Sequence, residues 1–418
     1  MEQERFSVRF NLASLAVFSM ALIVTTGGLA FILTHSLVVK ANATNPALAS
    51  PSKGEYDAMP AAMPAWGELV TYDIEIENPD EYMATDYDTN RVPTWVFESS
   101  GVDQVKQTLL ACGLTTSQVA SALAPSAVTV TTTNLVIRPE TELVLALAGD
   151  VRAKLYALLA RSPANTHMYY PACFPAKSFD LAMYESRVSP EVVALIKPLL
   201  YRRGDAQYFS DFEVVMRRVP SSEERLLLLK ALNRQPGVLA RLRIRPTTDV
   251  DKLLGYWTQS PGVRAKDLRP LVESLKRLPD GGTVSLVYFL PPFARERLYT
   301  FPMPPRAGEP AMDCHWSSLN FFSDQPEDRF GDPSYAGAYL SKNYYPVQKP
   351  SVYGDVIVLT DEKNAGIHSA VYVADDIVFT KNGNNHQQPW MLMRLNNLVA
   401  KYAAKGNLRV TAYRHKNS

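Results

Sequence analysis

The distribution of hydrophobic and polar residues divides the chain into a first stretch without charges and two long stretches of mixed periodicity. The first stretch, from Asn11 to Val39, contains no Asp, Glu, Lys or Arg. It is longer than the ~20 apolar residues that a helix needs to cross a bilayer. Residues 1–45 are therefore predicted to form a single-pass transmembrane anchor.

The residues around this span predict its orientation. Arg5 and Arg9 precede it, so the positive-inside rule places the N-terminus in the cytoplasm. The bulk of the chain would then be extracytoplasmic, in the periplasm or at the cell surface. The small residues at 41 and 43 are typical of a signal-peptide cleavage site, which leaves removal of the anchor open. Residues 46–66 are rich in Pro and Ala and are predicted to be a linker.

Residues 67–278 alternate between strand and helix patterns. Residues 68–77 and 126–137 are predicted strands, and residues 139–161, 220–235, 249–257 and 264–278 are predicted helices. We find no Gly-rich phosphate loop and no Cys or His pairs at zinc-ligand spacing in this segment. It is predicted to be a mainly helical or α+β domain that positions the C-terminal part or binds a protein partner.

Residues 279–418 combine further strands with two helices. Strands are predicted at 281–290, 355–359 and 407–415, and a hairpin is predicted from Ile367–Val373 and Ile377–Lys381. One helix is predicted to begin at Cys314, and another to span Pro389–Gly406. Antiparallel strands beside such helices predict an α+β fold for this domain.

The length and the net charge of the chain limit the number of domains and the classes of function to be considered. A chain of 418 residues is long enough for two or three domains. Its 43 basic and 42 acidic residues give a net charge of +1, which argues against nucleic-acid binding. The basic residues clustered between Arg217 and Arg245 are interpreted as solvated helix faces.

The three cysteines have two readings. Outside the cytoplasm thiols tend to form disulfides, and a Cys112–Cys173 pair would leave Cys314 as the free thiol. Alternatively, all three are reduced and two are small core residues. The sequence does not decide between these readings.

Cys314 has the features of a nucleophile. At the start of a helix, the partial positive charge lowers a thiol's pKa, and free backbone N–H groups can stabilise an oxyanion. His368, in a predicted strand, is the candidate base, while His315 is expected to point away from the thiol. Thr380 and Asn382, on the return strand of the hairpin, are candidates for orienting His368.

Two other readings of these residues stay open. An isolated cysteine and a histidine in a strand are, in most proteins, simply packed in the core. A metal site could instead use Cys314 with His315, His368 or His386, but adjacent Cys-His ligands lack the spacing of a structural zinc site.

The C-terminal pattern resembles that of NlpC-type, papain-like cell-wall cysteine peptidases. In those enzymes a tyrosine segment and a Gly/Pro loop lead to Asp-Cys and a helix, as Tyr299 leads to Asp313-Cys314 here. A Gly-Asp pair then opens a strand, here Gly354-Asp355. The His of the next strand matches His368, 54 residues after the cysteine.

The resemblance implies a function and roles for single residues. It implies hydrolysis of amide bonds in peptidoglycan stem peptides, with Cys314 as nucleophile, His368 as base and Tyr299 near the nucleophile. The third polar residue would be Thr380, with Asn382 as its substitute, and no cofactor or metal is required. His315-Trp316 stands where the family has Ser-Gly, so a catalytically inactive relative that serves as an envelope binding or scaffold protein is the alternative.

Overall fold

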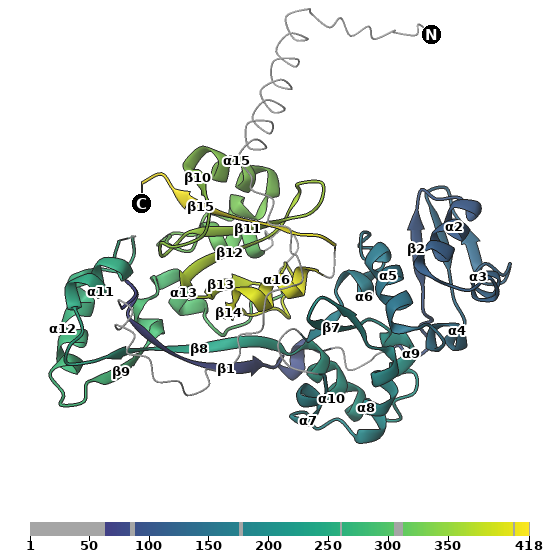
Figure 1. Cartoon of the computed structure of the whole chain (residues 1–418), viewed down its shortest axis with the longest axis horizontal. Helices are drawn as coiled ribbons and strands as arrows, with labels where there is room; N and C mark the ends of the chain where they lie inside the picture. Colours follow the sequence, from purple (N-terminus) through teal and green to yellow (C-terminus); the bar gives the residue numbers. More distant parts are fainter. Residues whose placement is uncertain are drawn as a thin grey trace, which may run out of the picture. The chain divides into compact units, whose positions relative to one another are not determined.

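The computed structural model describes residues 63–83, 88–174, 179–259, 261–304, 312–403 and 406–417, and Figure 1 shows how their elements are arranged. Their buried apolar side chains form three clusters. One cluster runs from Met83 to Leu232 along the chain, and a second runs from Val238 to Leu392. The third fills the side of the C-terminal sheet on which Leu398 and Tyr402 lie. The predicted boundary between residues 278 and 279 falls inside the second cluster.

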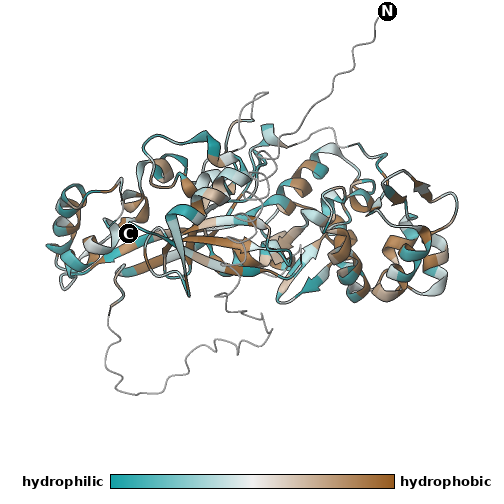
Figure 2. Ribbon diagram, turned by 90° about the horizontal axis from the view of Figure 1, so that it is seen from above, coloured by the Kyte–Doolittle hydropathy of each residue, from teal (hydrophilic) through white to brown (hydrophobic). Residues whose placement is uncertain are grey.

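The C-terminal part is built on one antiparallel sheet of six strands. Its order is β10-β15-β11-β12-β13-β14. The strands are β10 (Tyr344–Val347), β11 (Val356–Thr360), β12 (Gly366–Ala374), β13 (Ile377–Lys381), β14 (Trp390–Arg394) and β15 (Arg409–His415). The central strands are buried almost throughout, because helices or other strands cover both faces of the sheet. Figure 2 shows hydrophobic residues along strands in the middle of the molecule as well as on many of its helices.

Helices accompany this sheet along the chain. Short α14 (Cys314–Leu319) packs on β12 and β13, and α16 (Leu395–Ala403) follows β14. The remaining helices of this part are α11 (Val250–Trp257), α12 (Ala265–Lys276), α13 (Pro292–Arg297) and α15 (Pro333–Asn343). The hydroxyl of Tyr256 donates to the Val373 carbonyl at 2.7 Å, which ties α11 to the sheet.

A long hairpin contains an insertion. Strand β1 (Glu68–Ile76) pairs over its full length with β8 (Gln235–Ile244), and β9 (Gly282–Ser285) pairs with the other edge of β8. Figure 1 shows β1 and β8 side by side. Ile76 lies opposite Gln235. Residues 77–234 therefore leave the hairpin and return to it at one point.

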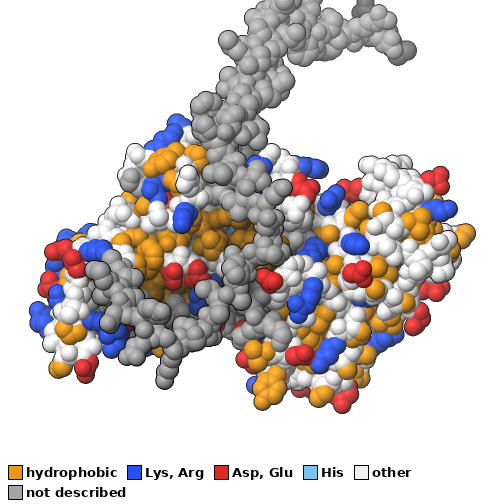
Figure 3. Space-filling model, viewed as in Figure 1, with side chains coloured by type: hydrophobic (Ala, Val, Ile, Leu, Met, Phe, Trp, Pro, Cys, Tyr) orange, Lys and Arg blue, Asp and Glu red, His pale blue; other side chains and the backbone are white. Residues whose placement is uncertain are grey.

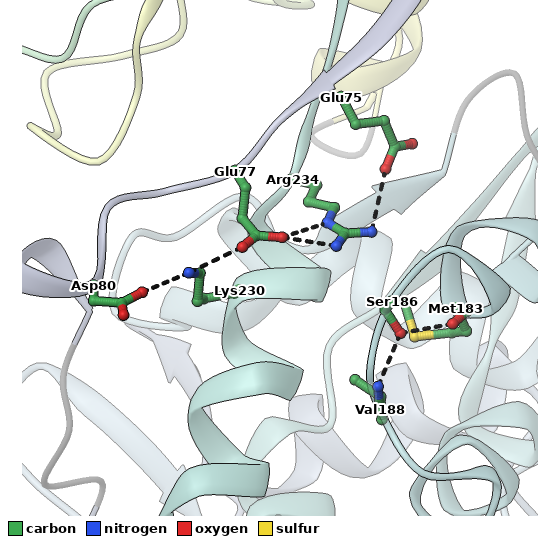
Figure 4. Close-up of polar contacts among 8 residues, drawn as sticks. All are labelled: Glu75, Glu77, Asp80, Met183, Ser186, Val188, Lys230 and Arg234. Carbon is green, nitrogen blue, oxygen red and sulfur yellow. Dashed lines mark hydrogen bonds and ion pairs between the residues drawn. The ribbon is translucent and has the colours of Figure 1, made fainter.

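Ion pairs hold the two ends of the insertion together (Figure 4). The Lys230 ammonium lies 2.9 Å from Glu77 and also contacts Asp80. The Arg234 guanidinium lies 2.7 Å from Glu77 and 3.8 Å from Glu75. Burial raises the pKa of Glu77, but the bonds from Lys230 and Arg234 outweigh it and leave that pKa below its ordinary value.

The insertion is itself α+β. Two small antiparallel sheets have the orders β2-β4-β3 and β5-β7-β6. Their strands are β2 (Trp95–Glu98), β3 (Val128–Val130), β4 (Asn134–Ile137), β5 (Ala172–Phe174), β6 (Tyr201–Arg203) and β7 (Ala206–Phe209). The helices are α2 (Val102–Cys112), α3 (Thr116–Ala122), α4 (Thr141–Leu145), α5 (Gly149–Leu159), α6 (Thr166–Tyr169), α7 (Phe179–Tyr184), α8 (Pro190–Ile196), α9 (Phe212–Met216) and α10 (Ser222–Asn233). The buried Arg152 guanidinium lies 3.0 Å from Asp211 in its core.

The predicted fold class was correct in being α+β with an antiparallel sheet and wrong in including a transmembrane helix. Among the described residues, no helix is both long and apolar enough to cross a membrane. The predicted span, Asn11 to Val39, lies outside the described residues, as do the N-terminal segment and most of the linker.

Several local predictions also need correction. Residues 126–137 form two paired strands, β3 and β4, and residues 139–161 form two helices, α4 and α5, where a single element was expected in each case. Of the strand expected at residues 281–290, only Gly282–Ser285 is a strand. Residues 389–406 were expected to form a single helix, but Trp390–Arg394 form strand β14 and only Leu395–Ala403 are helical. Four of the five side chains of β14 are buried, which a helix with one solvent-facing side would not allow. Pairing with β13 therefore determined the structure here.

Charged side chains of both signs are interspersed over the face drawn in Figure 3. This distribution fits the net charge of +1.

Candidate functional site

The site is built around the N-terminus of α14. The Asp313 side chain accepts a hydrogen bond from the Trp316 backbone N–H at 2.8 Å and so caps the helix. Cys314 is the first helical residue, as predicted, and its side chain is buried. Its thiol thus lies where the backbone N–H groups of a first helical turn have no intrahelical acceptor.

His368 and Thr380 lie on the neighbouring strands β12 and β13. His368 is fully buried, and its Nε2 lies 2.9 Å from the Thr380 hydroxyl oxygen. The ring of Tyr402, from α16, stacks on the His368 ring with 4.3 Å between the centroids. A hydrogen bond at the ring edge and a stacked ring on its face together fix the orientation of the imidazole.

His315 is turned toward the thiol, so the expectation that it points away was wrong. Its Nδ1 lies 3.0 Å from the Ser369 hydroxyl oxygen, which is itself 3.2 Å from the Cys314 carbonyl oxygen. Side chains on a helix lean toward the N-terminus of that helix, which brings the imidazole back beside residue 314. The thiol is therefore flanked by two imidazoles, His315 and His368.

These imidazoles determine the electrostatics of the thiol. Burial raises the pKa of Cys314, but the positive charges of His368 and His315 outweigh it and hold that pKa well below its ordinary value. Burial lowers the pKa of His315, but the Cys314 thiolate outweighs it and raises that pKa to about 9. Together these directions favour a thiolate beside protonated imidazole near neutral pH.

Burial shifts the pKa of two nearby ionisable groups, Asp313 and Lys381. It raises the pKa of Asp313 to about 6, with the Cys314 charge adding to the effect. It lowers the pKa of Lys381 to about 8. The Lys381 ammonium donates to the Gly383 and Asn385 carbonyls at 2.8 and 3.1 Å, and so holds the connection between β13 and β14.

The structure brings together three of the five residues proposed from the sequence: Cys314, His368 and Thr380. Asn382 is buried, but its amide nitrogen lies 4.0 Å from the Met391 sulfur, and Thr380 is the residue that bonds His368. The Tyr299 hydroxyl donates to the Val238 carbonyl of β8 at 2.5 Å, so it faces the hairpin.

Sequence reasoning named His315 but placed it wrongly, and it missed Ser369 and Tyr402. Ser369 directly follows the candidate base His368 in β12. Strand alternation directs its side chain to the opposite face of the sheet from His368, and this was the signal that the sequence offered. Tyr402 gave no such signal: its position depends on how α16 packs against β12.

The structure bears on the two other interpretations of the cysteines, a disulfide and a metal site. Cys112, Cys173 and Cys314 are all free thiols. Within the described ranges, no three His, Cys, Asp or Glu side chains are grouped as metal ligands.

Comparison of the chain with protein-family models, curated proteins and solved structures gave no match. What the site can do is therefore inferred from its geometry and its chemistry.

Proposed function

We propose that the chain is a thiol-dependent hydrolase of amide bonds, an endopeptidase or amidase, in which Cys314 is the nucleophile and His368 the base. The observation that carries this proposal is the buried thiol at the start of α14, flanked by His315 and by a His368 ring bonded to Thr380. A cysteine that only filled space would need neither the imidazoles nor the bonds that orient them.

The reaction follows from these positions. The Cys314 thiolate, whose proton rests on His368, attacks the amide carbonyl carbon, and the C=O π pair moves to oxygen. Backbone N–H groups at the start of α14 stabilise the oxyanion. As the C–N bond breaks, His368 gives its proton to the leaving amine and a thioester remains. His368 then takes a proton from water as the water oxygen attacks the thioester carbon, and the C–S bond breaks to leave the thiolate beside protonated His368, the state in which the cycle began. The product leaves as a carboxylic acid that loses its proton to solvent.

His315 and Thr380 have distinct roles in this proposal. Thr380 and Tyr402 position the His368 ring, while the charge on His315 supports the thiolate before attack. The resemblance to NlpC-type enzymes supplies the substrate class, peptidoglycan stem peptides.

Thiol labelling tests the proposal. We would measure the iodoacetamide labelling rate of each cysteine from pH 5 to 9 in the full-length wild type, in Cys314→Ala and in His368→Ala. Cys112 and Cys173 are internal controls, since burial raises the pKa of Cys112, and that of Cys173 to about 11. We expect fast labelling of Cys314 that loses its low-pH component in His368→Ala. An ordinary thiol profile, unchanged in His368→Ala, would leave the alternative of an inactive binding protein.

A further inference from the structure

Ser369 lies on the opposite face of β12 from His368, against the helix that carries the nucleophile. It is 2% exposed. Its hydroxyl oxygen lies 3.0 Å from His315 Nδ1, 3.2 Å from the Cys314 carbonyl oxygen and 3.2 Å from the Ser318 hydroxyl oxygen. Neither the proton transfers written for His368 nor the bonds that orient its ring involve this hydroxyl. Ser369 is therefore a buried polar group of the site without a role so far.

The single hydrogen of the Ser369 hydroxyl determines the state of the His315 nitrogen that it meets. A carbonyl oxygen can only accept, so the 3.2 Å contact with the Cys314 carbonyl requires that Ser369 donates there. The Ser369 oxygen then has only lone pairs to offer to His315 Nδ1. The Nδ1 atom must therefore be the donor of the 3.0 Å bond, and it carries a hydrogen.

The surroundings of the ring favour a second hydrogen on its other nitrogen. Burial lowers the pKa of His315, but the charges of Cys314 and Asp313 raise it. A hydrogen bond to the Gly366 backbone raises the pKa of the ring further. A Cβ built on Gly366 would lie 3.9 Å from the ring atom Cε1, so the imidazole lies against the start of β12. With hydrogens on both nitrogens the ring is an imidazolium, which has no lone pair and cannot act as a base.

The other cations near the thiol do not supply a constant charge. His368 acts on Cys314 from β12, but in the proposed reaction it gives up its proton. Burial lowers the pKa of Lys381 to about 8, although the charges of Cys314 and Asp313 oppose this effect. The pKa of His315 is about 9, so His315 keeps its proton to higher pH than Lys381 does.

We propose that Ser369 is a positioning residue that holds His315 as an imidazolium beside Cys314, and that this ring takes no part in proton transfer. His368 then moves the proton of the reaction, while His315 supplies a constant positive charge. In an ordinary Cys–His pair one imidazole does both. This inference rests on the proposed hydrolase function and assigns separate tasks to its two histidines.

Nitrogen-15 NMR of the histidine rings tests the proposal on the full-length chain. The chain has six histidines, and the signals of His315 are those that disappear in His315→Asn. We expect both ring nitrogens of wild-type His315 to carry hydrogens at neutral pH. In Ser369→Ala the proton affinity of the ring should fall by about tenfold or more, since the lost hydrogen bond is one to a charged group. Ser369→Thr, which keeps the hydroxyl, should restore the wild-type titration.

Iodoacetamide labelling of Cys314 shows whether Ser369 acts through His315. In Ser369→Ala the freed ring can turn away from the thiol, so the labelling profile should move to higher pH, as far as that of His315→Asn or less. The same substitution in a His315→Asn background should cause no further shift. Ser210→Ala is the matched control, because it removes an equally buried serine hydroxyl that bonds Tyr201 in the insertion, and it should leave the profile unchanged.

Three results would overturn the proposal: a neutral His315 ring in the wild type at neutral pH, an unchanged ring titration in Ser369→Ala, or a labelling shift that keeps its full size in the His315→Asn background. The outcome is separable from that of the hydrolase. A changed ring titration beside an ordinary thiol contradicts only the hydrolase. A reactive thiol beside an unchanged titration contradicts only the role of Ser369.

Discussion

The Tyr402 ring lies on the His368 ring with 4.3 Å between centroids and 24° between planes. Because Tyr402 comes from α16 and His368 from β12, this contact links the orientation of the imidazole to the packing of a helix against the sheet. The imidazole is thus held by residues that are distant from it in sequence.

Removing the Thr380 hydroxyl should weaken the thiolate. In Thr380→Val the shape is nearly kept, but His368 Nε2 loses its 2.9 Å bond. A bond to a charged group is worth about 1.5–3 kcal/mol, so its loss should raise the pKa of the Cys314 thiol. We expect the labelling profile of Cys314 to move to higher pH, with rates about tenfold or more lower where the wild-type profile is still rising. Thr380→Ser, which keeps the hydroxyl, is the control, and similar rates in both variants would contradict this role.

His315→Asn should shift the pH dependence of labelling. The thiol pKa is lowered in the folded protein, so reactivity should rise as pH increases through that low value. It should then stay level until His315 loses its proton near pH 9. Without His315 the thiol pKa moves back toward its ordinary value, so the rate should fall at pH 6 and change little at pH 9. His415→Asn, at the end of β15, should leave the profile unchanged, and an unshifted profile in His315→Asn would refute the role.

Gly354→Ala should destabilise the fold. Gly354 has φ of +98°, and an added Cβ would lie 2.4 Å from the Phe322 ring. Strain and overlap together predict a loss of about 2–4 kcal/mol in the free energy of unfolding. Gly337→Ala, in helix α15 with open space around the added Cβ, should instead stabilise by up to about 1 kcal/mol. Urea titration measures both, and equal effects would show that the Gly354 backbone is not the reason.

Arg414→Met should lower the free energy of unfolding by more than the removal of a surface charge does. Its guanidinium makes two bonds to the buried Asp355 carboxylate, at 2.9 and 2.8 Å. The substitution leaves a buried carboxylate without its cation, for which we expect a loss of about 2–4 kcal/mol. Arg264→Met breaks an exposed pair with Asp267 and should cost less than about 1 kcal/mol. Comparable losses in the two variants would argue against a specific role for the buried pair.

The core of the site could be predicted from the sequence because its signals are local. Asp313 is a good N-cap residue, which places Cys314 at a helix start, and strand alternation with a hairpin turn places His368 near Thr380. The position of His315 could not be predicted from helical periodicity, because the helix is short and the ring leans back over its first turn. The helix expected at residues 389–406 was half wrong, because pairing with β13 outweighed the helical pattern.

The position of Ile76 opposite Gln235 has a consequence for how the protein could be divided. Opposed residues in an antiparallel pair are only about 4.5–5.5 Å apart, so a two-residue turn could replace residues 77–234. Residues 77–234 thus form an insertion whose buried apolar side chains make up a hydrophobic core of their own. Calorimetry of the whole chain should then resolve two transitions, and a shortened chain should keep one of them. It would also keep Cys314 and His368, so the reactivity of the thiol could be measured with the insertion removed.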